Sequence, residues 1–336
     1  MEVAPPLLAL QAKLPRTRVT VTRLLPLGEM TIMRLQLACL LSSVLLSPAD
    51  ALAASPVRRM ALSRPHVRTT VHVRAAMPAL PTLAAACALP TCLGFWKTEY
   101  GVSYAYGAAT ATFSALVLRA SPGRLAAAHA LCILCYGVRL NCFLLWRELN
   151  IERFRKFRET IEERSKASGG RLKRTPFVLS CAFLYFCMCS PLLITAKFAP
   201  SPTCWPVLAL IAAGWSGFGI AAIGDTYKSL VKARRGAEHL VTGGIYRFLR
   251  HPNYTGEQLL WSANMLSGFA AAICAGPAAV RSASPLLAAS VIGWAGIMFV
   301  LARATSSLEK KQAERYNEFN RYRKVSWGGL GLKNAE

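Results

Sequence analysis

Apolar segments of near-spanning length recur along most of this 336-residue chain and limit what it can fold into. A membrane-spanning α-helix needs about 20 predominantly apolar residues, and its backbone polar groups must be paired within the segment. Seven segments approach that length, at 78–95, 103–121, 125–146, 176–197, 204–224, 258–277 and 285–304. We therefore predict an all-α fold, a polytopic membrane helix bundle with about six to seven transmembrane helices. The first segment is the least regular, because prolines and a threonine interrupt it at Pro81, Pro90 and Thr91.

The distribution of charge supports this fold class. Of all residues 54% are hydrophobic and only 17% charged, which is too apolar for an ordinary soluble domain. Half of the net charge of +24 lies in segments 147–175 and 225–256 and in the tail from Ser306. The positive-inside rule places these three segments on one side, cytosolic or stromal. We expect no nucleic-acid partner, because the positive charge is accounted for by membrane topology.

The first 75 residues differ in kind from the rest. They contain only three acidic residues and are rich in Arg, Ser, Thr, Pro and Ala. Residues 30–59 have the layout of a signal peptide, and the basic, hydroxylated stretch that follows is typical of a transit peptide. This order predicts an algal plastid membrane, with the endoplasmic reticulum or a misassigned start as alternatives. We take 1–75 as a presequence, 78–325 as the membrane domain and 326–336 as a tail.

The eleven cysteines do not indicate a metal site. Most lie inside apolar runs, where a thiol behaves as a small hydrophobic group. Cys132 and Cys135 have the CxxC spacing, but the second CxxC or the His pair that zinc requires is missing. We therefore expect packing roles and no bound metal.

The most polar motif of the chain, GGIYRFLRHPNYTGEQLLW at Gly243–Trp261, runs directly into an apolar segment. Pro252 suits the first position of a helix, where its missing N–H costs nothing. From there Asn253 and Glu257 recur every four residues with Trp261, so all three lie on one helical face. Such a face predicts a polar wall at the membrane edge.

Charged residues flank this face. Arg250 and His251 precede the helix, where free N–H groups favour an anion, and we expect them at the water edge. Glu257 is costly in hydrocarbon unless it faces a cavity or a partner. Gly256 leaves room for a neighbouring helix or a ligand. The alternative is a structural ion pair between Glu257 and either Arg250 or Arg139.

The motif resembles the C-terminal domain of the steroid 5α-reductase superfamily, in its bacterial, algal and plant branch. Two further stretches are similar to that family, LCYGVRLNCFLLWRELNIERFRKFRE at Leu134–Glu159 and LEKKQAERYNEFNRYRK at Leu308–Lys324. The likeness covers roughly residues 125–325. Isoprenylcysteine and phospholipid methyltransferases share related forms of the motif.

The resemblance implies roles for individual residues. Asn253 and Glu257 correspond to residues that hold NADPH, and Asp225 to an aspartate that closes the preceding helix. Tyr136 aligns with a tyrosine that polarises the substrate carbonyl, with Arg139 one turn away as a second candidate catalytic residue. The implied cofactor-binding set is Asp225, Lys228, Lys232, Tyr246, Arg250, His251, Asn253, Tyr254 and Glu257. 

The chain also departs from the family pattern. Ala221 stands where steroid enzymes have a nucleotide-binding Asn, and Glu99 is the only candidate for the family's catalytic Glu. The substrate is therefore expected to be lipophilic, but a steroid is only one option beside a prenyl chain, a tetrapyrrole or a fatty acyl chain.

The resulting hypothesis is an integral membrane oxidoreductase that transfers hydride from NADPH to an enone-type C=C bond. The basic, acid-poor loop at 225–256 suits the phosphates of NADPH. The alternative is a methyltransferase that uses S-adenosylmethionine, and a third possibility is a non-enzymatic channel or assembly factor with the same fold. The predicted partners are the lipophilic substrate and membrane lipids, and the sequence leaves the oligomeric state open.

Overall fold

The computed structural model describes residues 77–120, 123–167, 170–198 and 204–330. The predicted presequence, residues 1–75, lies outside these ranges and stays a prediction. The regular structure of the described part is entirely helical, and a single isolated bridge between Leu249 and Trp327 stands in place of any strand. The predicted all-α class is therefore confirmed.

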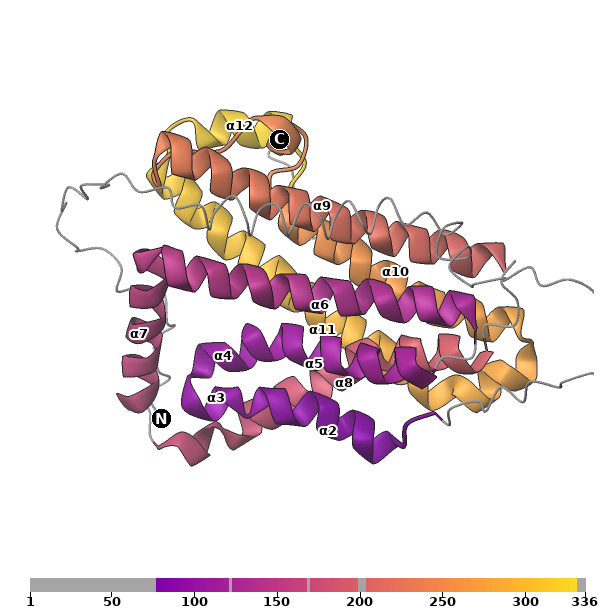
Figure 1. The fold of residues 1–336 in the computed structure, drawn as a ribbon. Helices are drawn as coiled ribbons and strands as arrows, with labels where there is room; N and C mark the ends of the chain where they lie inside the picture. Colours follow the sequence, from indigo (N-terminus) through magenta and orange to yellow (C-terminus); the bar gives the residue numbers. More distant parts are fainter. Residues whose placement is uncertain (1–76, 121–122, 168–169, 199–203, 331–336) are drawn as a thin grey trace, which may run out of the picture. The chain divides into compact units, whose positions relative to one another are not determined.

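The described helices follow the predicted apolar segments in order (Figure 1). They are α2 (Leu80–Thr91), α3 (Leu93–Trp96), α4 (Thr98–Val102), α5 (Tyr104–Ala120), α6 (Arg124–Asn150), α7 (Glu152–Ala167), η1 (Arg171–Arg174), α8 (Thr175–Phe198), α9 (Trp205–Arg235), η2 (Gly244–Arg247), α10 (Pro252–Cys274), α11 (Pro277–Arg315) and α12 (Phe319–Val325). The interrupted first segment is indeed broken, into α2 and α3.

Four stretches of helix are long and apolar enough to cross a membrane: α6, η1 with α8, α9 and α11. The remaining apolar helices pack among them, α10 mainly on α9 and α5 on α6, while α8 lies on α11. The protein is therefore an integral membrane helix bundle.

Helix α9 continues well past its apolar part. The expectation that Asp225 closes this helix is wrong, because α9 runs on to Arg235 and ends only at Gly236, whose φ is +96°. The residues after Asp225 remain helical, and the Ser229 hydroxyl donates a hydrogen bond of 2.8 Å to the Asp225 carbonyl oxygen one turn earlier. Lys228 and Lys232 thus project from a helical extension rather than from a loop.

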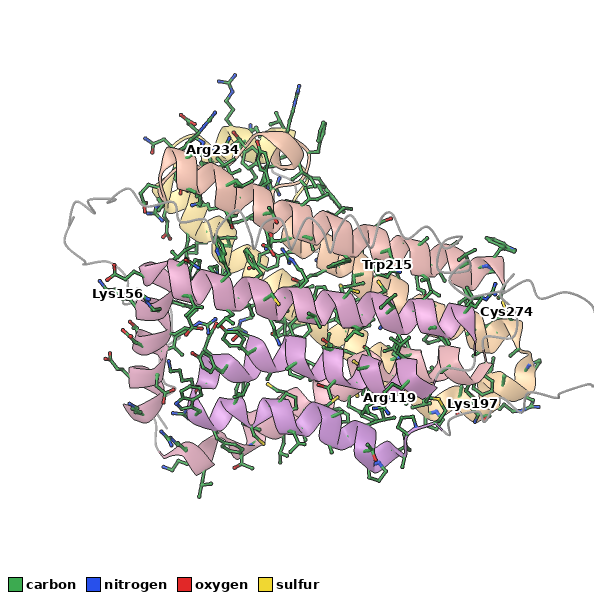
Figure 2. The ribbon with its side chains drawn as sticks, viewed as in Figure 1. Arg119, Lys156, Lys197, Trp215, Arg234 and Cys274 are labelled. Atoms are coloured by element: carbon green, nitrogen blue, oxygen red, sulfur yellow. The ribbon has the colours of Figure 1, made fainter. Side chains whose placement is uncertain are left out.

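Basic side chains concentrate at one end of the bundle. Figure 2 shows Lys156 and Arg234 there, beside α7 and the end of α9, and Arg119, Lys197 and Cys274 at the opposite end. Helix α12 lies at the same end as Arg234 (Figure 1). This arrangement agrees with the predicted topology, in which the three basic segments share one face.

Helices α9 and α10 approach each other through small residues. A Cβ added at Gly256 would lie 2.5 Å from the Gly217 carbonyl oxygen and 2.5 Å from the Ala221 nitrogen. A Cβ added at Gly224 would lie 2.9 Å from Cγ of Pro252. The room predicted at Gly256 is therefore filled by a neighbouring helix, and Ala221 is part of that contact.

Candidate functional site

The site begins where α5 and α6 cross. A Cβ added at Gly137 would lie 2.5 Å from the carbonyl oxygen of Gly107, so only glycines allow this approach. Each of these glycines follows a tyrosine, and the close crossing brings the two phenols together. The Tyr136 hydroxyl donates a hydrogen bond of 2.9 Å to the Tyr106 hydroxyl, and both side chains are buried.

Tyr106 is the centre of a polar cluster inside the apolar bundle. Its hydroxyl accepts a hydrogen bond from the Trp261 indole N–H at 2.6 Å and donates to the Glu257 carboxylate at 3.4 Å. The Tyr185 ring stacks on Tyr106 with centroids 5.5 Å apart. The predicted shared face of Glu257 and Trp261 is thus confirmed, since both reach the same hydroxyl. Sequence reasoning missed Tyr106, although the repeated Tyr-Gly pair was a usable signal.

An ion pair joins α6 to α9 beside this cluster. Arg139 Nη1 lies 2.9 Å from Asp225 Oδ2, with the two side chains 8% and 14% exposed. The Arg139 guanidinium also lies 4.9 Å from the centroid of the Phe143 ring. The alternative that Glu257 pairs with Arg139 or Arg250 is therefore wrong, because Asp225 neutralises Arg139 and, as the next contacts show, Glu309 neutralises Arg250.

Arg250 and His251 were expected at the water edge, but the structure buries both side chains. Each is 2% exposed, and both donate to Glu309 of α11, from Arg250 Nε at 2.8 Å and His251 Nε2 at 3.1 Å. Arg250 also donates to the carbonyl oxygens of Arg323, at 2.8 Å, and Ser326. A carboxylate of the protein itself thus lies against the two residues that precede α10, at the helix end where the dipole favours negative charge. The predicted cofactor role of Arg250 and His251 stays a prediction.

Burial sets the charge state of His251. Removal from water lowers the pKa of its imidazole below the ordinary value, and the hydrogen bond to Glu309 opposes this only in part. The side chain is therefore held more readily as neutral imidazole than it is in an unfolded chain.

Residues 326–330 form what we call the C-terminal strap, which crosses the start of α10. The Trp327 N–H donates to the Phe248 carbonyl at 2.9 Å, and the Arg250 N–H donates to the Trp327 carbonyl at 2.8 Å. Further along, the Gln258 side chain exchanges two hydrogen bonds of 3.0 Å with the Leu330 backbone. The sequence division that set 326–336 apart as a tail missed these contacts.

The remaining predicted residues lie around the strap and α9. The Tyr246 hydroxyl donates to the Gly224 carbonyl at 3.1 Å, so it joins η2 to α9. Asn253 and Tyr254 are half-buried, and the Asn253 amide makes no hydrogen bond within the described part of the chain. The two lysines of α9 line a small indentation together with His239, Leu240, Val241, Tyr246, Arg250, Gln312, Tyr316 and Tyr322.

Arg147, near the end of α6, was not predicted from the sequence. Its guanidinium lies 3.8 Å from the centroid of the Phe154 ring, and its buried Nε has no hydrogen-bond partner among the described residues. Asp225 and Tyr254 lie within its electrostatic range. Glu99, the candidate for a catalytic Glu, interacts with Arg147 and Arg158 at this same end and has no described contact with the tyrosines.

Fold and site together define a polytopic α-helical membrane protein with a buried hydroxyl cluster inside its helix bundle. Over residues 97–325 the chain matches the family described as a protein of unknown function, DUF1295, and it belongs to that family. Neither a curated protein nor a solved structure matches it. Within the described ranges no group of three His, Cys, Asp or Glu side chains could hold a metal ion.

Proposed function

We propose that this protein is a membrane reductase of the steroid 5α-reductase type, which uses NADPH to reduce an activated C=C bond of a lipophilic substrate. The observation that carries the proposal is the buried Tyr136 hydroxyl, held by Tyr106 and one helical turn from the Arg139–Asp225 pair. Such a hydroxyl is suited to a conjugated carbonyl oxygen, where negative charge gathers when a nucleophile adds to the double bond.

The residues at the basic end suit an anionic nucleotide. The buried Arg147 Nε has no hydrogen-bond partner among the described residues, and the Asn253 amide makes no hydrogen bond there either. Lys228 and Lys232 add positive charge along α9. Asp225, Asn253, Tyr254 and Glu257 would hold the nucleotide, with Arg147 and the two lysines toward its phosphates. Arg250 and His251 would not touch the nucleotide themselves. They would hold the start of α10 in place through their hydrogen bonds to Glu309.

NADPH, when bound, supplies a hydride for the β-carbon of the conjugated double bond. The chain must then stabilise the enolate oxygen and deliver a proton to the α-carbon. Tyr136 is the group placed to donate to the oxygen. Tyr106 links Tyr136 to the Glu257 carboxyl group. A proton that Tyr136 gives up can therefore be replaced through the Tyr106 hydroxyl, because these groups already lie within hydrogen-bonding distance.

The test is ligand-dependent thermal stability of the detergent-purified protein. NADPH should raise the unfolding temperature, and NADH should do so less, because it lacks the 2′-phosphate that the basic residues would bind. Glu257→Gln should weaken NADPH binding roughly 10- to 100-fold through the loss of charge-assisted hydrogen bonds. Glu314→Gln, which changes an exposed carboxylate of α11, is the matched control and should bind normally.

The same experiment separates the alternatives. Stabilisation by S-adenosylmethionine, with none by NADPH, would contradict the reductase and support a methyltransferase. Stabilisation by neither nucleotide would contradict both enzymes and favour a non-enzymatic channel or assembly factor. The plastid location remains a separate proposal, and a fluorescent fusion of residues 1–80 that stays in the cytosol or reaches the plasma membrane would refute it.

A further inference from the structure

Two cysteines meet at the end of the bundle opposite the basic face. Cys204 is the residue before α9, and Cys274 is the last residue of α10. Cys204 packs against the apolar cluster that contains Ala271, which lies one helical turn before Cys274 on α10. The Cys274 thiol lies within interaction range of the Cys204 thiol. They therefore occupy neighbouring positions at the ends of two antiparallel helices.

The Cys204 and Cys274 thiols are also accessible from outside the bundle, unlike the thiols of the other cysteines that lie close to one another. Cys274 is exposed and Cys204 half-buried. By contrast, Cys87 and Cys189 are both fully buried between apolar helices. The CxxC pair lies within one helix, with Cys132 only 1% exposed. Among the described cysteines, the Cys204–Cys274 pair alone combines mutual contact with access from outside the bundle.

The position of the pair in the membrane matters for its chemistry. Figure 2 shows Cys274 at the end opposite Lys156 and Arg234. If the basic face is cytosolic or stromal, this end lies on the non-cytosolic side. Protein disulfides form and persist mainly in such oxidising compartments.

We propose that Cys204 and Cys274 form an intramolecular disulfide on the non-cytosolic face. In its formation one thiolate attacks a disulfide such as oxidised glutathione, forming a mixed disulfide and releasing one reduced glutathione. The second thiolate then displaces the other glutathione. The two cysteines together lose two electrons and two protons, and one oxidised glutathione becomes two reduced molecules. The bond joins the start of α9 to the end of α10, the two helices that carry Asp225 and Glu257.

Peptide mapping tests the bond directly. The purified full-length protein is treated with oxidised glutathione, its remaining thiols are alkylated, and it is digested with trypsin without reduction. The proposal predicts a linked pair of peptides, 198–228 and 251–281, that separates on reduction. Cys204→Ser and Cys274→Ser should each abolish the linked pair. Cys142→Ser, which changes an exposed cysteine of α6, should leave it intact.

Other products would overturn the proposal. A stable glutathione adduct on Cys274 without the linked peptides would show that the second thiol cannot reach it. A disulfide between Cys274 residues of two molecules would show an intermolecular bond instead.

The predicted face has its own test. In sealed vesicles whose C-terminal epitope is protected from protease, a membrane-impermeant maleimide should label Cys274 of the reduced protein. Labelling that requires permeabilisation would place the pair on the wrong side. Because neither measurement uses NADPH, their failure leaves the proposed reductase function untouched.

Discussion

Tyr106 and Tyr136 come from adjacent helices, and their hydroxyl oxygens lie 2.9 Å apart because each tyrosine is followed by a glycine at the helix crossing. The Trp261 N–H also ends on Tyr106. One hydroxyl therefore connects α5, α6 and α10 at a point where water cannot substitute for a lost partner.

Replacement of that hydroxyl should be costly. Tyr106→Phe keeps the ring but leaves the Trp261 N–H and the Tyr136 hydroxyl without their acceptor. We expect the free energy of unfolding to fall by about 1–3 kcal/mol, measured by reversible unfolding in mixed micelles. Tyr316→Phe, at a half-buried tyrosine with no described hydrogen bond of its hydroxyl, should change it little. Equal losses in the two variants would contradict the central role of Tyr106.

The close approach of α9 and α10 gives a second prediction. Gly256→Ala places a methyl group 2.5 Å from backbone atoms of α9, so the two helices must separate. Overpacking of this kind costs about 1–3 kcal/mol. Gly219→Ala, on the same helix pair but with no atom within 4 Å of the added Cβ, should be neutral or slightly stabilising. Thermal unfolding of both variants checks the prediction, and a neutral Gly256→Ala would contradict the packing.

The sequence predicted best those features that depend on residues within a single helix. Apolar periodicity located the helices, and the spacing of Glu257 and Trp261 placed them on one face, which Tyr106 now joins. The same reasoning ended α9 too early, at Asp225, because a fall in hydrophobicity marks the membrane edge and not the helix end.

Partners from distant parts of the chain could not be predicted in the same way. Glu309 lies 59 residues from Arg250 and reaches it only because α11 packs over the start of α10. The C-terminal strap binds largely through backbone N–H and C=O groups, which every residue carries and no side-chain pattern marks. A glycine pair indicates a close crossing, but it does not say which two helices cross.

Removal of the Glu309 carboxylate, which Arg250 and His251 share, tests the contact between α11 and the start of α10. Glu309→Gln leaves the Arg250 guanidinium buried without a counter-charge, and breaking a buried pair in this way costs about 3–5 kcal/mol. Glu314→Gln, two turns or less along the same helix and exposed, should cost almost nothing. Chemical unfolding midpoints of the two variants give the comparison. A Glu309→Gln protein as stable as Glu314→Gln would show that the ion pair is not formed.

Stability should also depend on pH through His251. Burial lowers the pKa of this imidazole in the folded protein, whereas an unfolded chain takes up the proton near pH 6.5. Below about pH 6.5 the unfolded state therefore binds more protons, and the free energy of unfolding falls as the pH is lowered. The titratable and charged groups around the ring are Glu309, Arg250, Lys228 and Tyr254. His251→Gln should lose this part of the pH dependence, and an unchanged slope between the wild type and the variant would contradict it.

Truncation of the chain tests the C-terminal strap. A protein that ends at Val325 loses the hydrogen bonds from residues 326–330 to Phe248, Arg250 and Gln258. The start of α10 should then loosen, with faster amide hydrogen exchange over the Arg250–Gln258 stretch. If the proposed nucleotide site is correct, NADPH binding should weaken as well, because Asn253 and Glu257 lie on the loosened turns. A protein that ends at Leu330 keeps every one of these contacts and is the matched control. Equal exchange rates in the two truncated proteins would show that the strap does not hold the motif.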